Sequence, residues 1–101
     1  MELYTDWSGA IREASREACG MLGLGRKGAI RRTLPHFFVK NRERVFEMML
    51  TATGGTTTHF ATVLQSLQGK RRRVIVTISR GGNQRHDRLI WVLSPIDEGI
   101  A

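Results

Sequence analysis

The hydrophobic pattern of the chain changes its period near Thr56, and this change limits the folds open to it. Before that point, apolar residues recur every three or four positions, as they do along a helix packed on one side. After it, apolar and polar residues alternate in TTTHFATVLQSL, RRRVIVTIS and RLIWVL, as in half-buried strands. The sequence therefore predicts one α+β domain over residues 1–101, with a helical part in 1–53 and an antiparallel β-meander in 56–96.

The first predicted helix depends on apolar residues at four-residue steps, Leu3, Trp7 and Ile11, continued by alanines up to residue 18. Charged residues fall between them, so the segment has one apolar and one wet face. We expect this helix to begin near residues 5–8 and to end around residues 20–23, where glycines gather.

A second helix is predicted from the cap residue Asn41 to the pair Gly54-Gly55. Between the two helices, three glycines and Pro35 leave room for at most a short third helix, over about residues 27–34. Two, or with this segment three, helices would pack on one face of the three-stranded meander. The residues expected in the shared core are Trp7, Ile11, Val45, Phe46, Met49, Leu64, Val74, Val76, Ile78, Leu89, Trp91 and Leu93.

Charge is concentrated in the meander. The chain carries a formal net charge of +7 and its pI is near 11.1. Residues 70–88 hold seven basic side chains against one acidic one, whereas residues 51–69 hold no charged side chain. Most of the basic residues are arginines, whose planar donor fork suits phosphate oxygens. We therefore predict a non-catalytic nucleic-acid-binding protein whose Arg-rich hairpin contacts the phosphate backbone of DNA or RNA.

The predicted binding residues fall into two patches. The hairpin patch consists of Lys70, Arg71, Arg72, Arg73, Arg80, Arg85 and Arg88, and the second patch of Arg26, Lys27, Arg31 and Arg32. A different interpretation of the hairpin is a solvated strand edge that uses charge to prevent aggregation.

The stretch GLGRKG, residues 23–28, matches the glycine spacing of a dinucleotide-binding turn, but a helix and not a strand is predicted before it. A helix-turn-helix is another interpretation, although Gly28 would lie inside the second helix at a cost of about 1 kcal/mol. We interpret the stretch as a basic connection that adds phosphate contacts to those of the hairpin.

Two other functions stay open. His59 or His86, beside the basic sheet, could act as general acid or base in a metal-independent ribonuclease. The uncharged, threonine-rich segment 51–68 could instead pair with a neighbouring subunit in a ring-forming viral component of the head-tail connector kind. The three histidines and Cys19 are dispersed, so neither a metal nor a cofactor is expected.

The cellular location is predicted from the targeting and membrane signals that the sequence lacks. A single cysteine cannot form an intramolecular disulfide, and the longest apolar run beyond the N-terminus is the five residues 89–93. We expect no secretion signal and no membrane contact, a cytoplasmic or virion location, and a homodimer or higher homo-oligomer, because the core is small.

Overall fold

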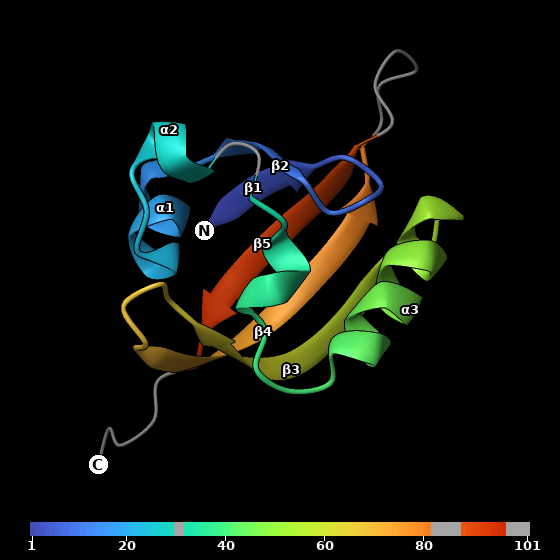
Figure 1. Ribbon diagram of the computed structural model, residues 1–101. Coiled ribbons are helices and arrows are strands. Elements are labelled where there is room, and N and C mark those ends of the chain that lie inside the picture. The colour runs from blue at the N-terminus through green and yellow to red at the C-terminus, as the bar shows by residue number, and fades with distance from the viewer. Residues whose placement is uncertain (30–31, 82–87, 97–101) are drawn as a thin grey trace.

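A computed structural model describes residues 1–29, 32–81 and 88–96 (Figure 1). Their strands form one antiparallel sheet in the order β2-β1-β5-β4-β3. The strands are β1 (Glu2–Thr5), β2 (Ile11–Ala14), β3 (Thr58–Gln65), β4 (Arg71–Arg80) and β5 (Leu89–Pro95). The last strand, β5, therefore lies in the middle of the sheet, between β1 and β4.

The helices are α1 (Arg16–Leu22), α2 (Arg26–Ala29), the 3₁₀-helix η1 (Leu34–Phe37) and α3 (Arg42–Thr53). In Figure 1, η1 and α3 lie over one face of the sheet, and α1 and α2 lie beside the edge formed by β1 and β2. No helix in the described ranges is both long and apolar enough to cross a membrane.

The predicted fold class, two or three helices on a three-stranded meander, is wrong. The first helix was expected to begin near residues 5–8, but the strand pair β1 and β2 lies within residues 2–14, and α1 begins only at Arg16. The strands are separated by a turn in which the Asp6 carboxylate accepts hydrogen bonds from the amides of Ser8 and Ala10. Gly9 completes this turn with a φ of +92°, a conformation that favours glycine.

The error arose because β1 is stabilised by a partner from the far end of the chain. Leu3 lies opposite Trp91 of β5, and both side chains are fully buried. A helical spacing of apolar residues in one segment carries no information about a pairing across almost 90 positions. Trp7, placed in the core by that spacing, lies in the turn and is 42% exposed.

The middle of the chain also differs from the expected short helix over residues 27–34. The chain forms α2, passes through the isolated bridge between Thr33 and Ala10, and then forms η1 with Pro35 in its first turn. In α3, Asn41 occupies the cap position with a φ of +59°, but its side chain makes no capping hydrogen bond.

The core lies between the sheet and the helices. The rings of Phe38 and Trp91 stack with centroids 6.1 Å apart, and Trp91 Nε1 donates a buried hydrogen bond of 2.8 Å to Thr5 Oγ1. Alternate residues of β4 and β5 reach this layer, whereas Ile75 points to the opposite face and is 43% exposed. Phe46, also expected in the core, lies on α3 and is 44% exposed.

Candidate functional site

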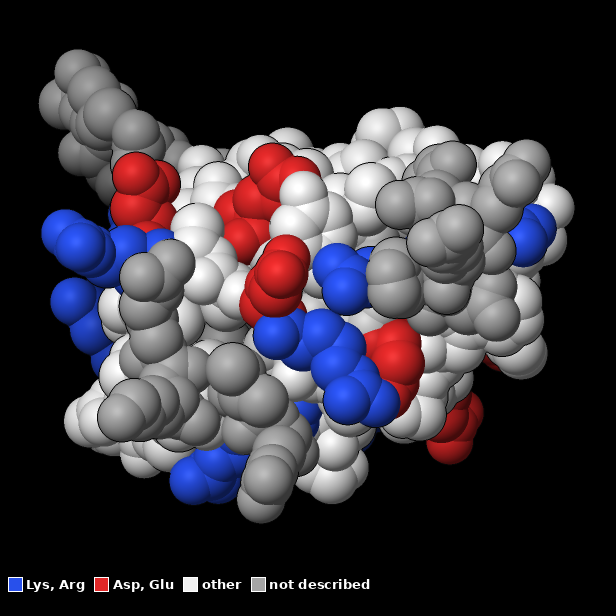
Figure 2. All heavy atoms as spheres, turned by 90° about the horizontal axis from the view of Figure 1, so that it is seen from above, with Lys and Arg blue, Asp and Glu red and all other residues white. Residues whose placement is uncertain are grey.

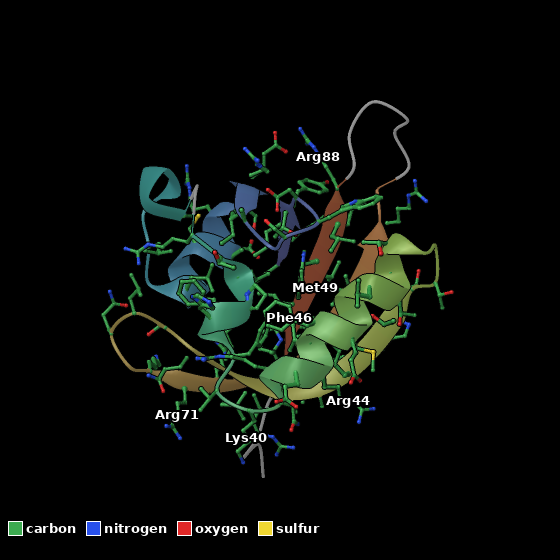
Figure 3. The ribbon with its side chains drawn as sticks, turned by 45° about the vertical axis from the view of Figure 1, so that its right-hand side comes forward. Lys40, Arg44, Phe46, Met49, Arg71 and Arg88 are labelled. Carbon is green, nitrogen blue, oxygen red and sulfur yellow. The ribbon has the colours of Figure 1, made fainter. Side chains whose placement is uncertain are left out.

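The arginines of the predicted hairpin patch do not form one surface. Arg71, Arg72 and Arg73 begin β4, whereas Arg80 ends it and Arg88 precedes β5. Because β4 has ten residues, its two ends lie roughly 30 Å apart. Figure 3 shows Arg71 and Arg88 at opposite ends of the sheet. We call these the Arg71 end, where β3 finishes and β4 and α3 begin, and the Arg80 end, where β4 and α3 finish and β1 turns into β2.

Arginines at the Arg80 end are held by other parts of the protein. The Arg80 guanidinium lies 5.6 Å from the centroid of a Trp7 ring, and its Nη1 donates a hydrogen bond of 3.4 Å to the carbonyl of Thr53. Arg88 forms an ion pair of 3.7 Å with Glu13. Figure 2 views this end from above and shows acidic side chains among the basic ones. Among its described residues, this end therefore lacks the single-sign surface that a phosphate backbone would need.

At the other end, Arg71 Nε donates to Gln65 Oε1 at 2.9 Å. Lys70 and Arg72 line a hollow that they share with Glu17 of α1. The hairpin patch is thus divided between two ends of the sheet and several partners.

The second predicted patch is only partly described. Arg26 and Lys27 begin α2, and Arg32 is exposed just before η1. Arg31, Arg85 and His86 lie outside the described residues. His59 is exposed on β3, and its Nδ1 lies 3.1 Å from Thr77 Oγ1. Within the described ranges, no three histidine, cysteine or acidic side chains gather into a group that could hold a metal.

One of the arginines, Arg32, borders an open cleft of about 370 Å³ that the sequence analysis missed. The cleft lies where η1 leads into α3, opposite the last residues of β3 and the start of the turn that follows. Its described lining contains the basic residues Arg32, His36 and Arg42, and no acidic one. The full lining is Arg32, Thr33, His36, Phe37, Phe38, Val39, Arg42, Gln65, Ser66 and Leu67.

Arg42, the first residue of α3, joins the cleft to the helix. Its Nε donates to the carbonyl of Phe38 at 3.2 Å, and its Nη2 donates to the carbonyl of His36 at 3.3 Å. These two bonds connect the end of η1 to the start of α3. Asn41, immediately before Arg42, has a left-handed backbone that costs a residue other than glycine of order 1–3 kcal/mol. The connection between η1 and α3 is therefore held in a strained form.

The sequence contained a signal for this site. The stretch RRTLPHFFVKNR places basic residues on both sides of a proline-containing, aromatic segment. It was overlooked because Arg42 was assigned to the second predicted helix, and because the bridge between Phe38 and Leu64, which brings β3 beside this stretch, is non-local.

The fold is similar to that of solved PAS domains. The PAS domain of an HTR-like protein from Haloarcula marismortui has a TM-score of 0.82 at 21% identity, covering 95% of this chain and 85% of that one. The PAS domain of nitrogen regulation protein NR(II) from Vibrio parahaemolyticus gives 0.77 at 18% identity, covering 94% and 87%. A domain of a sensory box sensor histidine kinase/response regulator from Geobacter sulfurreducens gives 0.77 at 9% identity, covering 92% and 80%. No protein-family model matches the sequence, and no curated protein matches it significantly.

These neighbours overturn the predicted function. They are PAS domains, one of them from a two-component sensor histidine kinase, so the nucleic-acid-binding prediction, with nucleic acid as partner, is wrong, and so are the viral connector and the ribonuclease. The physical reason is the one given above: the described arginines of the hairpin lie at both ends of the sheet, and Arg71, Arg80 and Arg88 bind other groups of the protein. The chain has the fold of a PAS domain.

Proposed function

We propose that this chain is a sensory module that binds a small molecule and passes the signal on through α3. The fold supports this proposal, because its structural neighbours include the PAS domain of a nitrogen regulation protein and a domain of a sensor histidine kinase. Those neighbours say nothing about which ligand this chain binds. We place the module in the cytoplasm, which is compatible with its single, buried cysteine.

The observation that carries the proposal is the position of Arg42. It lines the cleft, and the same guanidinium holds the carbonyls of His36 and Phe38 against the start of α3. A ligand that engages Arg42 therefore competes with, or reinforces, the bonds that fix the first turn of the helix. A ligand can shift a conformational equilibrium only through such a difference in interaction between two states.

The strained residue Asn41 makes this connection responsive. Asn41, whose φ is +59°, directly precedes Arg42 in the chain. A change in the hydrogen bonds of Arg42 therefore allows the backbone of Asn41 to relax. At its far end, α3 is attached to the sheet through the bond from Arg80 to Thr53. A movement that begins at Arg42 is thus conducted along a helix of 12 residues to the Arg80 end.

The test is a screen followed by a structural readout. Neutral, cationic and anionic small metabolites are added to the full chain, and its thermal unfolding is followed. A ligand at 100 times its Kd stabilises the native state by about 2.7 kcal/mol, which raises the Tm by several degrees in a chain of this size. For each ligand found, hydrogen exchange is measured over residues 38–53, where we expect a change in protection.

The matched variant is Arg42→Lys, which keeps the positive charge but loses the fork that spans two carbonyls. In this variant we expect the change of hydrogen exchange along α3 to be reduced at saturating ligand. The proposal fails if no compound in the screen changes the Tm, or if bound ligands leave exchange in α3 unchanged.

A further inference from the structure

The side chains that line the cleft beside η1 limit the kind of ligand that can bind there. The inference drawn from them rests on the proposed function. Its basic side chains all come from residues 32–42: Arg32 precedes η1, His36 lies within it, and Arg42 follows it. None of the described lining residues carries a negative charge. A site of this composition attracts anions and opposes cations.

The arginines are suited to a planar or tetrahedral anionic group. A guanidinium presents five N–H donors in a fixed fork, which can bind a carboxylate or a phosphate through two parallel hydrogen bonds. In Arg42, the hydrogen bonds from Nε and Nη2 to main-chain carbonyls fix the plane of the guanidinium, and the Nη1 donors stay available to a ligand. Arg32 is exposed and adds a second guanidinium to the same cleft.

Part of the remaining wall of the cleft is apolar. Phe37 is almost fully buried, whereas Val39 is 37% and Leu67 is 49% exposed. A binding cleft that combines a few charged groups with exposed apolar side chains is suited to a ligand that has one polar end and one apolar end. At about 370 Å³, the cleft lies at the small end of the range for ligand sites.

We infer that the cleft binds a small organic anion in which a carboxylate or phosphate head is joined to a short apolar body. The head lies on Arg32 and Arg42, and the apolar body lies against Val39 and Leu67. Thr33 and Gln65, which also line the cleft, are placed to hydrogen-bond oxygens of the head that the arginines do not reach. The site is separate from the core, where the stacked rings of Phe38 and Trp91 fill the space between helices and sheet.

The experiment compares probes that differ in one property. Benzoate and phenyl phosphate carry the two kinds of head on the same ring, benzamide is a neutral compound of nearly the same shape as benzoate, and inorganic phosphate lacks the apolar body. Each is titrated into the full chain by calorimetry at one fixed ionic strength. We expect benzoate or phenyl phosphate to bind at least tenfold more tightly than both benzamide and inorganic phosphate. Whichever of these two probes binds more tightly shows whether the cleft prefers a carboxylate or a phosphate head.

The variants localise the binding. Arg32→Gln removes an exposed guanidinium of the cleft, and we expect it to weaken binding of the better probe at least tenfold. Arg44→Gln makes the same change of charge on α3 but outside the cleft, where Arg44 points away from the sheet (Figure 3). We expect it to change the affinity less than twofold. Leu67→Ala should weaken the aromatic probes but leave inorganic phosphate unaffected.

Three results would overturn the inference: benzamide binding as tightly as benzoate, Arg44→Gln weakening the probe as much as Arg32→Gln, or no binding of either anionic probe. The last result, combined with a neutral ligand that alters exchange in α3, would leave the sensory function standing and remove only this ligand class. Conversely, anionic probes that bind in the cleft without altering exchange in α3 would support the ligand class and refute the sensory function.

Discussion

Arg80 and Arg88, at one end of the sheet, are bound to an aromatic ring, a helix carbonyl and a carboxylate. Arg32 and Arg42, by contrast, border an open cleft whose described lining has no negative charge to match them. The two regions contain the same type of residue, and both belong to segments that are basic in the sequence. At the Arg80 end the guanidinium groups bind other parts of the fold, whereas in the cleft Arg32 and the Nη1 donors of Arg42 face a space that a ligand can enter.

This difference shows why a count of charges along the chain did not locate the site. The meander holds the densest basic segment, yet its arginines are distributed over both ends of a ten-residue strand. The cleft depends on fewer arginines, placed by a turn and a 3₁₀-helix. What an arginine does is decided by which carbonyls, rings and carboxylates the fold brings to it.

The largest effect that tests this comparison is expected at two glycines. Gly9, at the Arg80 end, has a φ of +92°, and a Cβ there would lie 2.8 Å from Cδ of Pro35. Gly69, at the Arg71 end, has a φ of +86° and open space around it. Both alanine variants incur the backbone cost of about 1 kcal/mol or more, but only Gly9→Ala adds overpacking of about 1–3 kcal/mol. Urea unfolding measures the difference, and equal losses at the two sites would contradict the tight packing of the Arg80 end.

A second pair of variants compares buried polar groups. Thr5 Oγ1 accepts the hydrogen bond of Trp91 Nε1, and both residues are fully buried. Thr5→Val leaves that indole N–H without an acceptor, so we expect a loss of about 1–3 kcal/mol of unfolding free energy. Ser66 Oγ accepts from the amide of Lys70, an exposed residue that water can reach. Ser66→Ala should therefore cost less than Thr5→Val, and the reverse order in denaturant unfolding would refute this assignment.

The C-terminal strands and the N-terminal strands differ in how far the sequence predicts them. The alternation of apolar residues located β3, β4 and β5, because each strand has one face on the core and one toward solvent. The strands β1 and β2 have four residues each, too few for a pattern, and Leu3, Trp7 and Ile11 happen to match a helical period. Only the pairing of Leu3 with Trp91 distinguishes a strand from a helix here, and a short stretch of sequence contains no information about that pairing.

The candidate site was predicted even less completely. Arg32 was named from the sequence, although as part of a phosphate-binding patch, and Arg42 was only assigned to the second predicted helix. The bonds from Arg42 to the carbonyls of His36 and Phe38 depend on how tightly the chain turns between η1 and α3. That turn requires a left-handed Asn41, a conformation that asparagine adopts more readily than most residues but that no sequence pattern demands.

A smaller effect compares Arg80 with Arg32, which borders the cleft. Arg80→Gln removes the contact with Trp7 and the bond to the carbonyl of Thr53, so we expect it to lower the unfolding free energy by about 0.5–1 kcal/mol. Arg32→Gln should leave stability almost unchanged. A double-mutant cycle with Trp7→Leu measures how much of the Arg80 effect comes from the ring. A coupling of zero in this cycle would show that Arg80 is not held by Trp7, and the comparison between the ends would lose that support.

The smallest effect is a change in pH dependence at the turn between β1 and β2. Burial of the Asp6 carboxyl would raise its pKa, but hydrogen bonds from Ser8, Ala10 and Arg12 outweigh burial and lower the pKa below the usual value of 3.8. Because the pKa is lower in the folded chain, the ionised carboxylate stabilises the fold at pH values above the unfolded pKa. This stabilisation is lost as the pH falls through the folded pKa.

Asp6→Asn should accordingly be less stable than the parent chain at pH 6, and the difference between the two should shrink in acid, below a pH of about 4. The difference should become small in acid, because the carbonyl of the protonated Asp6 carboxyl and that of the asparagine can both accept a bond from the amide of Ser8. Glu47→Gln, which removes an exposed carboxylate from α3, is the control for the change in net charge. The measurement is the unfolding free energy of the parent chain and of both variants from pH 6 to pH 3. A difference that stays constant over this range would mean that the turn owes its stability to the shape of the Asp6 side chain, and that its ionisation contributes nothing to holding the Arg80 end together.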